Sequence, residues 1–206
     1  MGTVSIEPLT RTRVDETART LARAFDDSPL FQFMFPKGPA RLRIMAGTFR
    51  ATMLDALPFG NIHIATDELG VIGAACWLPP EGYPVPPRRQ AILFARMAAL
   101  FPNAPTRVRV AMRYLNASDS VHPKLMHWYL GILGVDPRHQ GEGIGAQLID
   151  HTLAQLDLEG LPAYLETDKE SNLAWYARRH FELRETLYPV PSGPPIWTMW
   201  RDPRDP

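Results

Sequence analysis

Apolar residues recur along this chain with two periods, and each period predicts one kind of element. A spacing of three to four residues places an apolar stripe along one side of a helix. This spacing predicts helices over residues 14–25, 41–56, 88–101, 106–118, 144–158 and 172–181. Shorter apolar or alternating runs between turn residues predict strands over 4–6, 62–66, 71–78, 127–135 and 163–167, and a closing hairpin of 184–190 and 196–201. Strands and helices are thus interspersed along one chain, which indicates an α/β protein.

Two segments follow neither period. Residues 79–87 are rich in proline and predict a linker, because proline fits neither a helix interior nor a central strand. After the first helix, Asp27 and Ser28 are suited to cap a new helix that begins at Pro29. The aromatic run that follows, from Phe31 onwards, either closes over the core or faces a ligand.

The most informative segment joins strand 127–135 to the helix that follows it. Pro137 ends the strand because it cannot donate a ladder hydrogen bond. Gly141, Gly143 and Gly145 then alternate, which frees the backbone and leaves no Cβ atoms to crowd a ligand. The turn delivers backbone N–H groups to a helix N-terminus, so the sequence predicts an anion-binding site here.

The spacing of this turn excludes the two commonest phosphate loops. The dinucleotide fingerprint needs two residues between its second and third glycines, whereas a single residue separates them here. A P-loop needs Lys and then Ser or Thr after its last glycine, and Ala146-Gln147 does not match. The run from Val135 to Gly145, V-x-P-x-x-Q-G-x-G-x-G, resembles instead the acetyl-CoA pyrophosphate loop of the GNAT superfamily of N-acetyltransferases.

This resemblance implies a GNAT-like α/β fold, with a mixed, mostly antiparallel sheet, a splayed central parallel strand pair and helices on both faces. It implies one domain over residues 1–206, with about 84–120 as a helical insertion, because the family core does not need both helices of that stretch. It also implies acetyl-CoA as the cofactor. The residues expected to hold it are Leu133, Gly134, Val135, Gln140, Gly141, Glu142, Gly143, Ile144, Gly145, Ala146 and Asn172.

The resemblance also nominates catalytic residues. The family carries an Asn near the start of the last core helix and a Tyr four residues on, which are Asn172 and Tyr176 here. A phenol with a pKa near 10 stays protonated at neutral pH and can donate a proton to a leaving thiolate, whose conjugate pKa is about 8.5. Glu166, at the end of strand 163–167, is the candidate for accepting the amine proton, the alternative being proton loss to water. His180 stands where the family usually has Gly, so a left-handed backbone at some strain is expected there.

The acceptor side is predicted from fewer signals. In the resembled family the segment between the first two helices contributes to the acceptor site, so Asp27 would lie near a cationic amine and Phe31 would form an apolar wall. Tyr129 lies on a face of the central strand where relatives often place a base, and it is a candidate wall residue. For Phe31, Tyr129 and Tyr176, packing in the core is the alternative, and for Asp27 it is capping the helix that begins at Pro29. The two helices of the insertion would cover the acceptor cleft or form a homodimer face.

The composition limits the partners. The 22 basic and 22 acidic residues give a formal net charge of zero, which argues against nucleic acid or a membrane surface as a partner. No run approaches about 20 apolar residues and the N-terminus lacks a signal core, so a cytoplasmic protein is expected. The single cysteine, Cys76, excludes an internal disulfide and a multi-cysteine metal site. We expect no metal and no covalent acyl-cysteine route.

Together these features predict an acetyl-CoA-dependent N-acetyltransferase. Its expected acceptor is the primary amine of a small molecule, for example an aminonucleoside or another antibiotic-like amine, by direct transfer in a ternary complex. Two alternatives stay open. An acyl-CoA-binding regulatory module would keep the loop without turnover. A protein or peptide N-acetyltransferase would present an open groove rather than a covered pocket.

Overall fold

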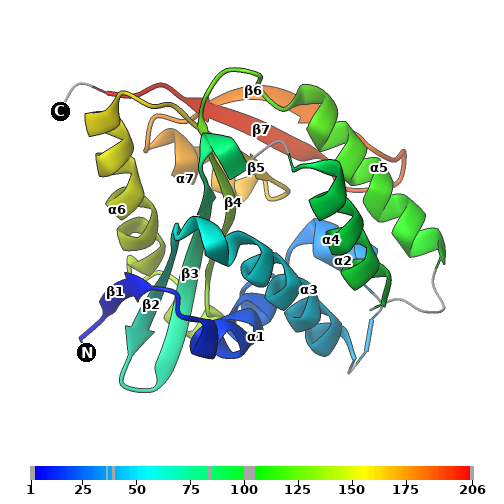
Figure 1. Ribbon diagram of the computed structural model, residues 1–206, viewed down its shortest axis with the longest axis horizontal. Coiled ribbons are helices and arrows are strands. Elements are labelled where there is room, and N and C mark those ends of the chain that lie inside the picture. The colour runs from blue at the N-terminus through cyan, green and yellow to red at the C-terminus, as the bar shows by residue number, and fades with distance from the viewer. Residues whose placement is uncertain (1–2, 36, 39, 83–84, 100–104, 205–206) are drawn as a thin grey trace.

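The computed structural model describes residues 3–35, 37–38, 40–82, 85–99 and 105–204. Its centre is a seven-stranded sheet in the order β1-β2-β3-β4-β5-β7-β6 (Figure 1). Neighbouring strands are antiparallel except for β4 and β5, which are parallel. The predicted fold class is therefore confirmed. The strands are β1 Ser5–Pro8, β2 Ile62–Asp67, β3 Gly70–Leu78, β4 Trp128–Val135, β5 Ala163–Thr167, β6 Glu182–Leu187 and β7 Ile196–Arg201.

Helices cover both faces of this sheet (Figure 1). Helices α1 (Val14–Ala24) and α3 (Arg41–Ala56) pack on one face, and α6 (Ile144–Glu159) and α7 (Ser171–Ala177) pack on the other. The remaining α-helices are α2 Pro29–Met34, α4 Pro87–Ala99 and α5 Pro105–Val121. Short 3₁₀ helices occupy Arg11–Arg13, Leu57–Phe59, Pro80–Gly82 and Pro137–His139.

The apolar run of β3 is continuous because both faces of this strand are buried. Val71, Ala74 and Cys76 pack in the core beneath α1 and α3, whereas Ile72 and Trp77 pack in the core beneath α6. Successive side chains of a strand point to opposite faces, and here both faces are covered. Burial also raises the pKa of the Cys76 thiol to about 12, so this cysteine stays protonated and is not a nucleophile.

The last core helix ends earlier than its pattern predicts. It was expected over 172–181, but α7 stops at Ala177. The Phe181 N–H donates to the Tyr176 carbonyl at 3.2 Å, and His180 has a φ of 65°. This left-handed turn, expected at His180, reverses the chain and places the Phe181 ring 5.8 Å from that of Tyr176. Phe181 therefore packs against α7 although it lies outside that helix, which explains why its spacing in the sequence matches the helical pattern.

The segment after α1 forms a helix rather than an aromatic loop. The Ser28 hydroxyl accepts a hydrogen bond from the Phe31 N–H at 3.1 Å, which confirms a cap before Pro29. Helices α4 and α5 lie between β3 and β4, where two helices were predicted. The predicted helix end at Phe101 and residues 83–84 of the linker lie outside the described residues.

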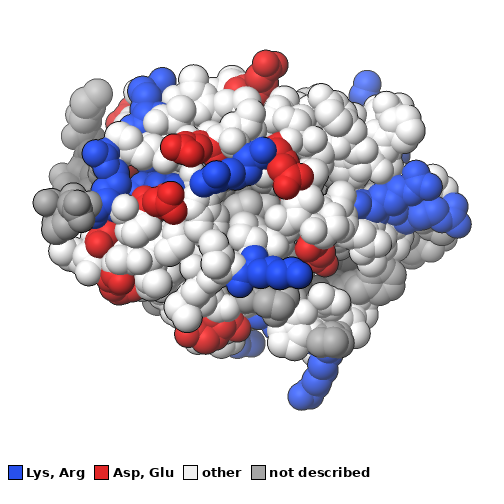
Figure 2. All heavy atoms as spheres, turned by 90° about the horizontal axis from the view of Figure 1, so that it is seen from above, with Lys and Arg blue, Asp and Glu red and all other residues white. Residues whose placement is uncertain are grey.

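The surface carries both signs of charge. Figure 2 shows acidic and basic side chains interspersed over the face seen from above, in keeping with the net charge of zero. Of the helices that the structure describes, none has the length and apolar character needed to cross a bilayer.

Candidate active site

Strands β4 and β5 separate after a short paired stretch. The paired residues are Trp128 with Ala163, Tyr129 with Tyr164 and Leu130 with Leu165. Beyond this point β4 runs on to Val135 while pairing with β3 on its other side, and β5 stays paired with β7 up to Thr167. The freed edge of β4 lines a cavity of about 630 Å³, which we call the cofactor cleft. The splay is therefore formed as predicted from the resemblance.

Gly134 has a packing reason to be glycine. A Cβ atom there would lie 2.8 Å from the Phe25 ring and 2.9 Å from Leu21, both at the end of α1. Helix α1 thus lies closer to β4 than it could if any residue other than glycine stood at position 134. Leu133, Gly134 and Val135 all line the cofactor cleft, as expected.

The glycine loop forms the second wall of the cofactor cleft. Gly141 and Gly143 have φ values of 85° and 81°, in the left-handed region that disfavours side chains, and Gly143 is the N-cap of α6. The first turn of α6 therefore presents N–H groups that have no partner within the helix. Gln140 holds the loop against the strand, because its side-chain amide donates to the Val135 carbonyl at 3.1 Å.

Most of the predicted loop residues line the cofactor cleft. They are Gln140, Gly141, Gly143, Ile144, Gly145 and Ala146. Glu142 is the exception. Its side chain is exposed, lies 3.3 Å from His139 and does not line the cavity, so only its backbone N–H could serve the predicted role. In a loop with alternating left-handed residues, the side chain between two glycines turns to solvent.

Asp136 anchors the loop and was missed by the sequence reasoning. Its carboxylate is 1% exposed and accepts hydrogen bonds from Arg23 Nε at 2.8 Å and Arg138 Nε at 3.0 Å. Burial alone would raise the pKa of Asp136, but hydrogen bonds from Arg138 and Arg23 outweigh it and hold the pKa well below its usual range. Asp136 therefore ties the loop to α1. The available signal was an Asp directly before the loop proline, a common N-cap position.

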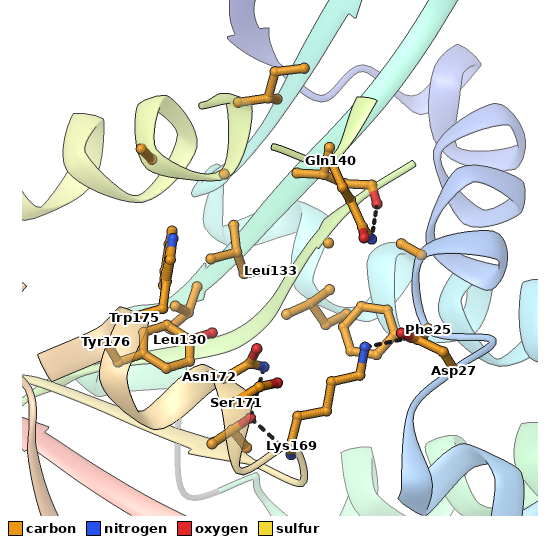
Figure 3. Close-up of a pocket in the computed structure, with 18 of the residues that line it drawn as sticks. Phe25, Asp27, Leu130, Leu133, Gln140, Lys169, Ser171, Asn172, Trp175 and Tyr176 are labelled. Atoms are coloured by element: carbon orange, nitrogen blue, oxygen red, sulfur yellow. Dashed lines mark hydrogen bonds and ion pairs between the residues drawn. The ribbon is translucent and has the colours of Figure 1, made fainter. Parts of the chain in front are cut away.

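The third wall comes from β5 and α7 (Figure 3). The Asn172 amide donates to the Thr167 hydroxyl at 3.1 Å, which joins the start of α7 to the end of β5. Tyr176 lines the cleft at 7% exposure, and burial raises the pKa of its phenol well above the ordinary value. Trp175 lies beside it, stacked at 3.8 Å under the Arg179 guanidinium.

Two loops bridge the mouth of the cofactor cleft. Figure 3 shows the Lys169 side chain reaching across to Asp27, with which it forms an ion pair. Asp168 accepts hydrogen bonds from the Ser28 hydroxyl at 2.5 Å and the Leu30 N–H at 2.7 Å. Asp168 and Lys169 were missed, although a charged run directly after a core strand was a usable signal. Asp27 lines this cleft and is paired with Lys169, and its place beside an acceptor amine stays a prediction.

A second cavity of about 730 Å³ lies on the α3 and α5 side of the sheet, and we call it the acceptor cavity. Gly131, Ile132 and Glu166 line both cavities, so the two meet where β4 and β5 part. Tyr129 lines the acceptor cavity, as the wall assignment expected.

Phe31 lines neither cavity. Its ring stacks on those of Phe35 and Phe49, each at 5.3 Å between centroids. Its assignment to a pocket wall is therefore corrected to the core alternative. The physical reason is that α2 places residues four apart on one side, which turns Phe31 and Phe35 inward together.

Glu166 is held in a fixed position at the junction. Tyr164 donates to its Oε1 at 2.9 Å and Ser118 donates to its Oε2 at 2.6 Å. Burial raises the pKa of Glu166, and these two hydrogen bonds oppose part of that rise. Tyr164 and Glu166 are two apart on β5 and share the face toward α5, whereas Tyr176 belongs to the core on the α6 and α7 face. The splay lets groups from both faces of the sheet meet.

Within the described ranges, no group of three or more His, Cys, Asp or Glu side chains could hold a metal ion.

The chain matches a family model described as the acetyltransferase (GNAT) family over residues 105–181. Two relatives match over a similar share of the chain. An uncharacterized N-acetyltransferase of Schizosaccharomyces pombe is 33% identical over 78 residues, 37% of this chain and 32% of that protein. The N-alpha-acetyltransferase RimI of Mycobacterium tuberculosis is 42% identical over 79 residues, 36% of this chain and 48% of that protein. The chain thus spans less than half the length of each.

The fold comparison covers the whole chain. A histone acetyltransferase HPA2 and related acetyltransferase from Corynebacterium glutamicum superposes with a TM-score of 0.73 at 23% identity, over 100% of this chain and 99% of that one. The chain therefore has the fold of the GNAT acetyltransferases. The family model and both relatives each match less than half of the chain, and over those lengths they show its similarity to N-acetyltransferases.

Proposed function

We propose that this protein transfers the acetyl group of acetyl-CoA to a primary amine of a small molecule, directly and within a ternary complex. The observation that carries the proposal is the junction of the two cavities at Gly131, Ile132 and Glu166. A thioester entering from the cofactor cleft and an amine entering from the acceptor cavity would meet there. Holding both reactants in contact removes most of the entropic cost of a bimolecular step.

The cofactor cleft is suited to acetyl-CoA by its backbone. N–H groups of the loop and the positive end of the α6 dipole would hold the pyrophosphate without a lysine. Leu133 to Val135 pair with β3 on one side and have no β5 partner on the other, so the pantetheine amides could add to that free side as an extra strand would. Asn172 would fix the wall opposite.

Tyr176 is proposed as the acid. Its raised pKa keeps the phenol protonated over the whole neutral range, although it also makes Tyr176 a weaker acid than a free phenol. We therefore propose that the Tyr176 phenol donates a hydrogen bond to the thioester sulfur. This hydrogen bond strengthens as negative charge develops, and the proton is transferred as the C–S bond breaks.

Glu166 is proposed to accept the proton of the attacking amine. It lines the acceptor cavity, whereas His127, which directly precedes β4, lines neither cavity. His127 instead lies 3.0 Å from His122 through their Nε2 atoms, and burial lowers its pKa. Its surroundings are aromatic, which suits a packing role.

The acceptor assignment favours a small molecule because α4 and α5 contribute to the wall of the acceptor cavity. Because they line this cavity, we favour the interpretation that α4 and α5 cover the acceptor site over the interpretation that they form a homodimer face. The C-terminal part of the sequence is similar to puromycin N-acetyltransferase in its Leu-Glu-Thr strand end, which brings aminonucleosides into the acceptor panel. The match to an N-alpha-acetyltransferase makes peptide N-termini the second candidate.

The test is release of the CoA thiol from acetyl-CoA by the purified chain with a panel of small amines, aminonucleosides and tripeptides. We expect amine-dependent release with small amines. Binding of acetyl-CoA without release for any amine would instead favour the regulatory module. No heat of binding in calorimetry would contradict the acetyl-CoA assignment itself.

Replacing Glu166 by Gln is expected to lower kcat by about 10-fold at neutral pH, since the amide cannot accept the proton and water takes over only in part. The carboxylate form is the active one, so wild-type kcat should fall as the pH decreases through the raised pKa of Glu166. The variant should lack this acidic limb. Rates at saturating amine from pH 5 to 8 measure both effects, and an unchanged kcat would remove the assignment.

A further inference from the structure

The charges around the acceptor cavity are unevenly placed, and from them we infer that the acceptor is a monoamine with a bulky apolar body, with diamines and polyamines disfavoured. This inference rests on the proposed function and narrows its substrate class. It depends on three features of the wall: where the carboxylates lie, what covers the remaining surface, and which charges are already paired.

Carboxylates gather at the end of the acceptor cavity that meets the cofactor cleft. Glu166 lines both cavities and accepts a hydrogen bond from Ser118. Asp119 also lines the acceptor cavity and follows Ser118 on α5. An acceptor ammonium is therefore favoured at the junction, which is where its nitrogen must attack.

The wall beyond the junction is largely apolar. Its apolar side chains include Leu30, Met34, Phe35, Leu78, Met112 and Ile196. A hydrocarbon or aromatic body placed against them leaves water, which is favourable in proportion to its apolar area. The volume of about 730 Å³ lies within the range of small-molecule sites.

The other charged side chains of the acceptor cavity, Asp55, Arg89 and Arg107, already have partners within the protein. Asp55 on α3 accepts hydrogen bonds from Arg89 on α4, with Nε at 2.7 Å and Nη2 at 2.5 Å. Arg89 also donates to the Gly82 carbonyl at 3.0 Å, and Arg107 donates to the Met34 carbonyl at 2.6 Å. Asp55 and Arg89 line the acceptor cavity alone, whereas Asp119 directly follows Ser118, which donates a hydrogen bond to Glu166 at the junction, so we place the Asp55–Arg89 pair away from the reacting end.

A second ammonium on the acceptor would meet unfavourable surroundings. Among the described residues that line the acceptor cavity, the carboxylates are Asp55, Asp119 and Glu166. Two of these serve the reacting end, and Asp55 is neutralised by Arg89. The distal ammonium of a diamine would lose water without gaining a counter-ion, and the two arginines would repel it.

The experiment compares amines matched in length on the wild-type chain. Pentylamine and cadaverine share five carbons and differ by one ammonium, and phenethylamine and spermidine extend the comparison. We expect kcat/KM for pentylamine and phenethylamine to exceed that for cadaverine and spermidine by at least about 10-fold. Equal or better use of cadaverine or spermidine, or a preference for a tripeptide, would overturn the inference while leaving acetyl transfer established. No release with any amine would contradict the proposed function itself.

A variant makes the reasoning about the Asp55–Arg89 pair testable. Replacing Arg89 by Gln leaves Asp55 able to bind a distal ammonium, so the ratio of kcat/KM for cadaverine to that for pentylamine should rise by about 10-fold. The double substitution of Asp55→Asn with Arg89→Gln removes the carboxylate and should restore the wild-type ratio. The Kd for acetyl-CoA reports whether each variant is folded. A folded Arg89→Gln chain with an unchanged ratio would contradict the role given to this pair.

Discussion

Replacing Tyr176 by Phe is expected to lower kcat by about 100- to 1000-fold, with little change in the Kd for acetyl-CoA. The substitution removes one hydroxyl from a side chain that is 7% exposed and lines the cofactor cleft beside the splay. The thiolate would then leave without a hydrogen-bond donor. The ring itself remains, so packing against Phe181 is kept.

The pH dependence of this variant separates catalysis from packing. Because burial raises the pKa of Tyr176, its phenol is protonated, and therefore active, up to a pH above the ordinary phenol value. The ratio of wild-type to variant kcat should consequently stay constant between about pH 7 and 9.5. Tyr188→Phe is the matched control, since Tyr188 is 71% exposed and lines neither cavity. Wild-type activity in Tyr176→Phe would show that Tyr176 only packs.

Replacing Gly143 by Ala is expected to weaken acetyl-CoA binding by about 30-fold, which corresponds to about 2 kcal/mol. Gly143 has a φ of 81° at the N-cap of α6, and an L side chain in this region costs about 1–2 kcal/mol. The variant relieves this strain by turning away from the left-handed region. The N–H groups then no longer converge, and binding must restore the strained form.

The same helix provides a matched control for this substitution. Gly160 caps the other end of α6 with a φ of 65°, and a Cβ atom at either glycine would meet no atom within 4 Å. Both substitutions should therefore lower the free energy of unfolding by a similar amount, about 1–2 kcal/mol. Only Gly143→Ala should weaken acetyl-CoA binding in calorimetry. Equal Kd values for the two variants would show that the loop does not hold the cofactor.

Local features of the site could be predicted from the sequence because their causes are local. Pro137 ends β4, the glycines make a left-handed turn, and the apolar stripe fixes the helix after it. Each of these depends on backbone angles and on neighbours within a few residues. The left-handed backbone at His180 was expected only from the resemblance, in which Gly usually stands at this position, and the structure has it.

Contacts between distant segments could not be predicted in this way. Asp27 and Lys169 are far apart in sequence, and their ion pair exists only because the C-terminal ends of α1 and β5 lie near each other. Phe31 turns into the core because α2 is a helix, which alternation in the sequence did not indicate. Asp136 gains its partner Arg23 from α1 by packing across the sheet.

The sequence by itself determined the type and order of the elements and the loop at the start of α6, because hydrophobic period and glycine conformation act over short distances. Only the tertiary structure decided that two cavities meet at Glu166, and that Asp55 is neutralised by Arg89 in the wall of one of them. These arrangements depend on how far β4 and β5 part and on where α4 and α5 lie over the sheet. Such distances arise from the packing of the whole chain, and a linear pattern does not contain them.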